Sequence, residues 1–272
     1  MIRGIFARNV KTTTMQNDNH NVNVISQSWD FYFCRINSKP ASIALNLGLK
    51  KHAPIAALPI LLTVIVDMQH PDESGFSTRD EFETLGEIED HITEYFQRDL
   101  EAMQVGRIKS DGKQELLYYA PNGDGLEDVL KNAMADFSTY RYRFGVRTDA
   151  DWSEYTDFLY PDPYQYQAIQ NRRVVQQLEE QGDKLEQERE VDHWLYFTTE
   201  ADMNSYISEV EKLGYKVLSQ RKEEEKESSF ILNIARNDKV VWNIVNEYVW
   251  ELCDIAEKHN GSYDGWGCPV QK

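Results

Sequence analysis

Asp192 and His193 place an acid beside a base within a strand-like run that extends from Arg189 to Phe197. A carboxylate that contacts an imidazole can orient it for proton transfer, which is the chemistry of a general acid or base. Neighbouring side chains of a strand point to opposite faces of the sheet, so we expect these two side chains not to touch. No serine or cysteine stands in the sequence context of a catalytic nucleophile. We therefore interpret His193 as a structural residue and predict no catalytic residue.

The side chains that commonly bind metal ions are scattered along the chain. No two of the six histidines are three or four residues apart, and the cysteines Cys34, Cys253 and Cys268 lack the spacing of metal ligands. We therefore expect no metal and no cofactor. A sparse, odd set of cysteines is typical of reduced thiols, which favours a cytoplasmic location. The glycine-rich segment 122–125 lacks the lysine of a phosphate-binding loop, and we interpret it as the turn that starts a helix.

Several residues are instead suited to contact another protein. Tryptophan and tyrosine are enriched at binding hot spots, and carboxylates attract a basic partner. The partner-binding candidates are Asp192, Trp194, Glu223, Glu224, Glu225, Tyr263, Asp264 and Trp266. A second interpretation of these residues stays open, because the rings can be core or strand-pairing residues and the glutamate run can be a solvated hairpin tip.

The composition narrows the class of partner. The chain has 272 residues with 29 basic and 46 acidic side chains, and its net charge is −17. Such a surface repels the phosphate backbone of nucleic acids and attracts basic proteins, so we expect a protein partner and no direct binding to nucleic acid. The longest apolar run, from Ile55 to Val66, contains Pro59 and is too short to cross a bilayer. We expect no membrane partner, and the oligomeric state stays open.

The elements that must position the candidates follow one order in the last third of the chain. Apolar residues alternate through the strand that contains His193, and they recur at intervals of three and four in the next helix, which Gly214 ends. The pattern predicts, in order, a strand at 191–197, a helix at 200–213, strands at 215–221 and 230–236, a helix at 240–258 and a strand at 262–270. This βαββαβ order is that of a ferredoxin-like unit. We interpret Asp264-Gly265 as a turn in which the glycine takes a positive φ.

The same order is predicted nearer the N-terminus, after a β-hairpin with strands at 29–33 and 42–47. The predicted elements are a strand at 58–66, a helix at 78–103, strands at 105–109 and 115–120, a helix at 125–137 and a strand at 140–146. In the first helix, Thr78 and Glu81 resemble a capping box, and Phe82 shares the apolar face. The predicted fold class is therefore α+β, with two ferredoxin-like βαββαβ units in tandem, the first preceded by a β-hairpin.

These elements divide the chain into three parts. Residues 1–27 are polar and are predicted to be a mobile leader, residues 28–161 an N-terminal α+β domain, and residues 165–272 a C-terminal domain that begins with a helix at 165–181. The aromatic segment 155–166 contains Pro161 and Pro163, which disfavour a helix, so we interpret this segment as a packed linker.

Three segments of the last third resemble a known family. They are Leu213-Gly214-Tyr215-Lys216-Val217, Ala256-Glu257-Lys258 and Tyr263-Asp264-Gly265-Trp266-Gly267. Their order and spacing resemble the regulator of ribonuclease E activity B family, a family of protein inhibitors of ribonuclease E, over residues 170–270. The resemblance implies a non-catalytic regulatory module that binds a ribonuclease E-like enzyme and so modulates RNA turnover. An acidic face would then occupy the basic RNA-binding segment of that enzyme.

The first half resembles a bacterial domain family of unknown function on the segments Trp29-Asp30-Phe31-Tyr32, Lys39-Pro40-Ala41-Ser42 and Asp151-Trp152. This resemblance implies a domain boundary and no chemistry. Two alternatives to the regulatory module stay open. One is a hydrolase that uses carboxylates in a cleft between the two units, which a deep polar cleft with shifted pKa values would favour. The other is a small-ligand sensor, which an apolar pocket between the units would favour.

Overall fold

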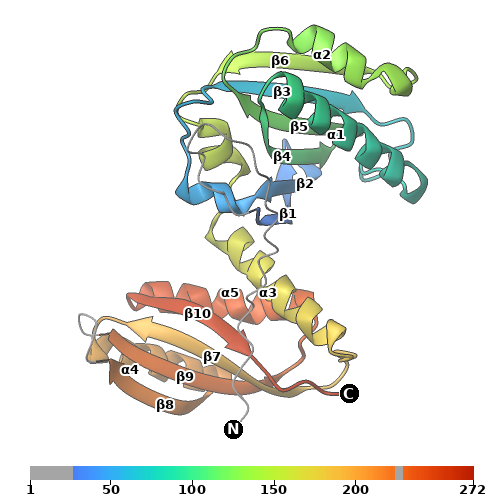
Figure 1. Cartoon of the computed structure of the whole chain (residues 1–272). Helices are drawn as coiled ribbons and strands as arrows, with labels where there is room; N and C mark the ends of the chain where they lie inside the picture. Colours follow the sequence, from blue (N-terminus) through green and yellow to red (C-terminus); the bar gives the residue numbers. More distant parts are fainter. Residues whose placement is uncertain (1–26, 224–228) are drawn as a thin grey trace. The chain divides into compact units, whose positions relative to one another are not determined.

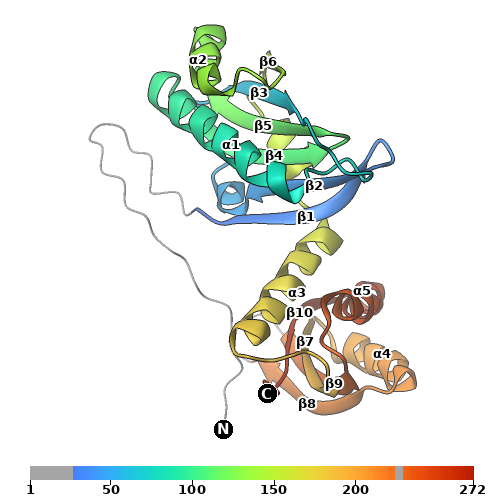
Figure 2. The same cartoon turned by 90° about the vertical axis from the view of Figure 1, so that its right-hand side faces the viewer.

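The computed structural model describes residues 27–223 and 229–272, which form two compact units with a boundary between Gln165 and Tyr166 (Figures 1 and 2). Each unit combines helices with one antiparallel sheet, so the α+β class predicted from the sequence is confirmed. The predicted leader lies outside the described residues up to residue 26. No helix in the described part of the chain combines the length and the apolar character needed to span a membrane.

The N-terminal unit contains a six-stranded sheet with the order β1-β2-β4-β5-β3-β6. Its strands are β1 (Trp29–Ile36), β2 (Lys39–Asn46), β3 (Ile60–Asp67), β4 (Met103–Ser110), β5 (Lys113–Ala120) and β6 (Tyr142–Thr148). Asn37 and Ser38 both take a left-handed φ between β1 and β2, which confirms the predicted hairpin. From β3 onward the elements follow the predicted βαββαβ order.

The helices α1 (Arg79–Asp99) and α2 (Leu126–Ala133) cover one face of this sheet (Figure 1). α1 carries an apolar stripe at helical spacing and packs it against alternate residues of β3 and β5, because a strand presents every second side chain to the same face. The stripe and its contacts are Leu85, Ile88, Ile92 and Phe96 against Leu62, Val64, Leu116 and Tyr118. Full burial of each aliphatic or phenyl side chain contributes about 1.5–3 kcal/mol.

The start of α1 differs from its prediction. Thr78 makes no side-chain capping bond, and the carboxylate of Glu81 accepts hydrogen bonds from the backbone N–H groups of Gln69 and His70 at 2.6 and 2.8 Å. Glu81 therefore ties the preceding loop to the helix in place of the predicted capping box. Phe82 was predicted on the buried face but is 57% exposed, because its position falls beside the buried stripe.

The segment that follows β6 corrects the predicted linker. Residues Glu154–Leu159 form a short π-helix, and Trp152 and Tyr155 are fully buried in the N-terminal unit. Trp152 stacks on Tyr119 with 4.1 Å between ring centroids, and the Tyr155 hydroxyl donates to the carbonyl oxygen of Asn46 at 2.8 Å. Burial of these rings stabilises a helical turn, and the two prolines stand after it and do not interrupt it.

The helix α3 (Pro163–Glu180) begins two residues earlier than predicted. The carboxylate of Asp162 accepts a hydrogen bond from the backbone N–H of Gln165 at 2.8 Å, and the side-chain oxygen of Gln165 accepts one from the backbone N–H of Asp162 at 2.9 Å. This reciprocal capping box starts the helix. Pro163 then occupies the first helical position, where its missing N–H has no cost, so the proline favours this helix start.

The C-terminal unit contains a four-stranded sheet with the order β10-β7-β9-β8. Its elements after α3 are β7 (Arg189–Phe197), α4 (Glu200–Val210), a 3-10 turn (Glu211–Leu213), β8 (Lys216–Glu223), β9 (Ser229–Asp238), α5 (Trp242–Lys258) and β10 (Gly261–Gly267). Gly214 takes a left-handed φ of 88° after the 3-10 turn, as a helix-ending glycine should. The βαββαβ order predicted for this unit is observed.

The core of the C-terminal unit lies between its sheet and its helices. α4 and α5 lie on the same face of the sheet (Figure 2), and α3 extends this layer near β10. β7 buries alternate side chains beneath the helices, and α3 packs Val175 and Leu178 against the same layer. The inward residues of β7 are Val191, His193, Leu195 and Phe197. The opposite side of the sheet, which we call the outer face, carries the other half of the β7 side chains.

Candidate protein-binding surface of the C-terminal unit

The outer face brings three of the sequence-predicted candidates together. Asp192 and Trp194 project from β7 as half-buried side chains. Gly265 of β10 is paired with Trp194, and the exposed Asp264 precedes it in the same strand. Trp194 and Asp192 therefore belong to a face that α4 and α5 do not cover, and Asp264 is exposed in the neighbouring strand. Such a half-exposed ring with acidic neighbours is suited to contact a basic protein surface.

One glycine of β10, Gly267, lies beside the ring of Trp194. A Cβ atom on Gly267 would lie 3.6 Å from that ring, at ordinary van der Waals distance, whereas a Cβ atom on Gly265 would meet nothing within 4 Å. The indole therefore lies against the backbone of β10 at Gly267. Burial, followed by the negative charge of Glu190, raises the pKa of Asp192, so this carboxylate is already partly removed from water.

The Asp264-Gly265 dipeptide does not form the predicted turn. Tyr263 is paired with Leu195 and Gly265 with Trp194, so Asp264 is the extra residue of a β-bulge inside β10. The φ of Gly265 lies outside the left-handed region. The prediction of a positive φ was wrong because a bulge accommodates one additional residue within a strand and does not reverse the chain.

The other two aromatic candidates face the core. Trp266 is 7% exposed, and its indole N–H donates to the side-chain oxygen of Asn171 at 3.0 Å. The hydroxyl of Tyr263 lies 2.7 Å from Nδ1 of His193. Both side chains belong to the helix-covered layer, because Trp266 is paired with His193 and Tyr263 with Leu195, which both point inward. For these two rings the structure supports the core interpretation.

His193 is fully buried in an aromatic cage. The rings of Tyr215, Tyr248 and Tyr263 lie 5.6, 5.7 and 5.9 Å from the imidazole, measured between centroids. Burial, followed by the positive charge of Arg236, lowers the pKa of His193 to about 3, so the imidazole is neutral near pH 7. Within the described residues, Nε2 of this ring has no hydrogen-bond partner.

His193 and the neighbouring acid lie on opposite faces of the sheet. The imidazole points inward while the Asp192 side chain projects from the outer face, as the strand alternation predicted. The Asp192 carboxylate therefore does not orient the imidazole, and the pair lacks the geometry of an acid–base dyad.

The remaining candidates are the three glutamates of the run 223–225. Glu223 is the last residue of β8, and its backbone is paired with that of Ser229. Glu224 and Glu225 lie outside the described residues. The role of this glutamate run in binding a basic partner stays a prediction.

The thiols and the acidic groups do not gather into a recognisable metal site in the described ranges 27–223 and 229–272, where no group of three or more His, Cys, Asp or Glu residues is arranged to hold an ion. Cys34, Cys253 and Cys268 are free thiols. Burial raises the pKa of Cys253 to about 12 and that of Cys268 to about 11, so both thiols are protonated near neutral pH.

A buried ion pair that sequence reasoning missed holds the start of β7 in place. The side chains of Asp183 and Arg189 are each 1% exposed and form two hydrogen bonds with each other, one of them 3.0 Å long. Asp183 also accepts a bond from the backbone N–H of Gln271 at 2.8 Å, which joins the chain after β10 to this pair. The sequence feature that could have revealed this ion pair is Arg189, a lone arginine at the start of an apolar strand.

Sequence reasoning also missed the exposed face of α5. Glu247, Trp250, Glu251 and Asp254 recur at intervals of three and four, which places them along one side of the helix. The same periodicity that identifies a buried stripe therefore identifies an acidic and aromatic stripe here. These residues line a groove with the end of α4.

In the comparison with known proteins, a different family model matches each unit. Residues 27–160 match the model of a family of unknown function, DUF695. Residues 168–268 match the model of the family Regulator of ribonuclease activity B. Both resemblances inferred from the sequence are thereby confirmed.

The individual proteins that match this chain have low sequence identity to it. The chain is 27% identical over 110 residues to a regulator of ribonuclease activity B from Xenorhabdus nematophila, a match that covers 39% of this chain and 77% of that protein. Among solved structures, an unknown protein from Galdieria sulphuraria is 12% identical with a TM-score of 0.23, and the match covers 78% of this chain and 99% of that one.

Proposed function

We propose that this protein is a regulator that acts by binding another protein and performs no catalysis itself, with residues 168–268 as the binding part. The observation that carries the proposal is the match of these residues to the family Regulator of ribonuclease activity B. We infer that the partner is a ribonuclease E-like enzyme and that binding modulates RNA turnover.

The charge of the chain supports this choice of partner. An enzyme that binds RNA needs a basic surface, because the phosphate backbone of its substrate is negatively charged. A protein with a net charge of −17 is attracted to that surface and repelled by the RNA itself. Occupation of the basic surface then competes with RNA, which gives a regulator an effect without any chemistry of its own.

The outer face is the contact surface in this proposal. Trp194 supplies the anchoring ring, and Asp192 and Asp264 supply the charge that selects a basic partner. The glutamate run 223–225 adds negative charge to the sequence at the end of β8. A tryptophan near the centre of an interface typically contributes more than 2 kcal/mol, whereas surrounding charges mainly increase the association rate.

We also infer that both units are ferredoxin-like. Read from the fourth strand of each βαββαβ unit, the sheet orders are β6-β3-β5-β4 and β10-β7-β9-β8, and every neighbouring pair is antiparallel. Both orders correspond to 4-1-3-2. On this basis we propose domains at 28–161 and 165–272, which the compact-unit boundary at Gln165 supports.

The proposed function is tested with the purified chain and a purified ribonuclease E-like enzyme. Binding kinetics and the rate of RNA cleavage are measured for the unchanged protein, for Trp194→Ala and for a control, Phe144→Ala, which removes an exposed ring from the N-terminal unit. We expect Trp194→Ala to raise the dissociation rate by about 30-fold, corresponding to a loss of about 2 kcal/mol, and to relieve inhibition. The control should bind as the unchanged protein does.

The result that contradicts the proposal is equally specific. If the unchanged protein neither binds the enzyme nor alters its cleavage rate, the regulatory function is wrong. If it binds and Trp194→Ala has the same kinetics as Phe144→Ala, the regulatory function stands but the outer face is not the contact surface.

A further inference from the structure

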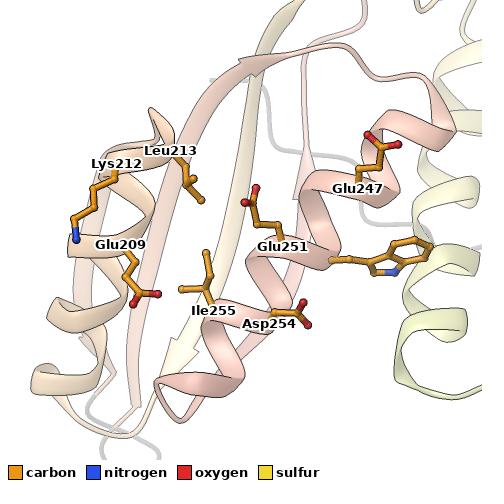
Figure 3. A pocket seen from close by; sticks show the side chains of 8 residues that line it. Glu209, Lys212, Leu213, Glu247, Glu251, Asp254 and Ile255 are labelled. Carbon is orange, nitrogen blue, oxygen red and sulfur yellow. The ribbon is translucent and has the colours of Figure 1, made fainter.

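A groove lies between two helices of the C-terminal unit, on the side of the sheet opposite the outer face. It has a volume of about 600 Å³, within the range of ordinary ligand and side-chain pockets. The end of α4 and the following 3-10 turn form one wall, and α5 forms the other (Figure 3). Its lining residues are Glu209, Lys212, Leu213, Glu247, Trp250, Glu251, Asp254 and Ile255.

The floor of the groove is apolar and firmly supported. Leu213 and Ile255 are half-buried, and both pack against the hydrophobic core beneath them. Figure 3 shows these two side chains in the space between the helices. Trp250 is half-buried and adds aromatic surface to the lining. An apolar side chain that entered the groove would exchange water for contacts with Leu213 and Ile255, which is favourable.

The rim of the groove is acidic. It carries four carboxylates against the single ammonium group of Lys212. Glu209 is already engaged, because it pairs with Lys258 and lies 3.5 Å from Nε2 of His259. In the described part of the chain, no hydrogen bond or ion pair with another residue engages Glu247 or Glu251, although the positive charge of Arg236 on β9 acts on Glu251. These two carboxylates stand one helical turn apart, so they repel each other, and a cation placed between them relieves that repulsion.

The orientation of α4 adds to this preference for positive charge. Glu209 lies in the last turn of α4, and Lys212 and Leu213 lie in the 3-10 turn that follows. The carbonyl groups at the C-terminal end of a helix carry a partial negative charge and attract cations. An apolar floor, an acidic rim and a helix C-terminus therefore favour the same kind of occupant.

We propose that this groove binds a short, basic, amphipathic helix of another protein. An apolar side chain of that helix fills the space above Leu213 and Ile255, and lysine or arginine residues four positions apart pair with Glu247 and Glu251. Helices that lie in grooves place their anchors at such intervals. This surface is separate from the outer face, so it goes beyond the contact surface of the proposed function.

The test uses the full chain and two labelled peptides of about 14 residues, or roughly 20 Å of helix. The first peptide is an amphipathic helix of leucine and lysine, and the second has serine in place of every leucine. Fluorescence anisotropy measures their affinities for the unchanged protein and for two double variants. Glu247→Gln with Glu251→Gln removes the groove carboxylates, and Glu179→Gln with Glu180→Gln removes two exposed carboxylates from α3.

We expect the leucine-lysine peptide to bind the unchanged protein about tenfold more tightly than the Glu247→Gln, Glu251→Gln variant, and to bind the α3 variant as it binds the unchanged protein. The serine-lysine peptide should bind about tenfold more weakly than the leucine-lysine peptide. Absence of binding overturns the proposal. If both double variants lose the same affinity for the leucine-lysine peptide, the peptide is attracted by the net charge alone. If both peptides bind the unchanged protein with equal affinity, the apolar floor does not contribute to binding. Either result overturns the proposal. The kinetics of Trp194→Ala with the ribonuclease test the proposed function separately.

Discussion

The indole N–H of Trp266 donates a hydrogen bond to the side-chain oxygen of Asn171, 3.0 Å away, and this bond joins β10 to α3. Both side chains are buried. The side-chain amide of Asn171 donates in turn to Asn246 on α5 at 2.9 Å. The tryptophan of the Tyr-Asp-Gly-Trp-Gly segment is therefore part of a polar network that fixes three elements of the C-terminal unit against one another.

Loss of this hydrogen bond should destabilise the C-terminal unit. Trp266→Phe keeps most of the apolar contact but removes the donor to Asn171, and we expect the free energy of unfolding to fall by about 1–3 kcal/mol. Trp194→Phe on the outer face should change it by less than about 0.5 kcal/mol. Urea unfolding followed by circular dichroism measures both values. Equal stability of the two variants would show that the network does not hold the elements together.

Gly261 and Gly265 should respond differently to alanine, although both lie in β10. A Cβ atom on Gly261 would lie 2.3 Å from the ring of Phe197, so Gly261→Ala must displace that buried ring, and we expect a loss of about 1–3 kcal/mol. Gly265 has free space at its Cβ position and an ordinary φ, so Gly265→Ala should not lower stability. The melting temperatures of the two variants measure these effects. If Gly265→Ala melted at a lower temperature than Gly261→Ala, the register of β10 would be wrong.

The stability of the C-terminal unit should depend on acid pH through Asp183. Burial opposes the ionisation of this carboxyl, but hydrogen bonds from Arg189 and from the N–H groups of Gln271 and Leu185 outweigh burial and lower its pKa to about 2. The ordinary value of 3.8 applies to the unfolded chain. Because the folded pKa is the lower one, the stabilisation is fully present above pH 3.8 and is lost as the pH falls through about 2.

Asp183→Asn provides the measurement. The substitution leaves Arg189 buried without its carboxylate, and we expect a loss of about 3–5 kcal/mol near pH 7. The difference in unfolding free energy between the unchanged protein and this variant should shrink from pH 5 to pH 2. The exposed Asp264→Asn is the control and should keep the profile of the unchanged protein. A difference that does not vary with pH would contradict the assigned role of Asp183.

The C-terminal unit should fold by itself if its first helix keeps its cap. Residues 162–272 retain the reciprocal bonds between Asp162 and Gln165, whereas residues 166–272 lack them. We expect both fragments to unfold cooperatively in urea, the longer one with about 1 kcal/mol more stability from the cap. Non-cooperative unfolding of the longer fragment, beside a cooperative intact chain, would refute an independent C-terminal unit.

Association with a basic partner should depend steeply on salt. Attraction between exposed charges is screened beyond about 8 Å at physiological ionic strength, so high salt should slow association of this acidic chain. Changing Glu223, Glu224 and Glu225 to lysine should slow association more than it speeds dissociation. The control reverses three exposed carboxylates of α1, Glu83, Glu87 and Asp90. Salt-independent binding, or equal effects of the two triple reversals, would exclude docking through the hairpin.

The sequence by itself determined the features that depend on local pattern. Apolar alternation in β7 predicted that His193 and Asp192 point to opposite faces of the sheet, and helical spacing identified the buried stripe of α1. Turn residues identified the hairpin at Asn37-Ser38, and the order of segments predicted βαββαβ in both units. These features depend on neighbours within a few residues along the chain, whose periodicity the sequence contains directly.

Only the tertiary structure decided which side chains have partners across space. Glu81 receives its hydrogen bonds from the loop before α1, Trp266 donates to a residue of α3, and Gly265 lies in a bulge whose register β7 sets. Burial, hydrogen bonding and the groove between α4 and α5 arise where distant segments meet. The sequence pattern indicates whether a side chain prefers to be buried or paired, whereas the tertiary fold determines which residue it contacts.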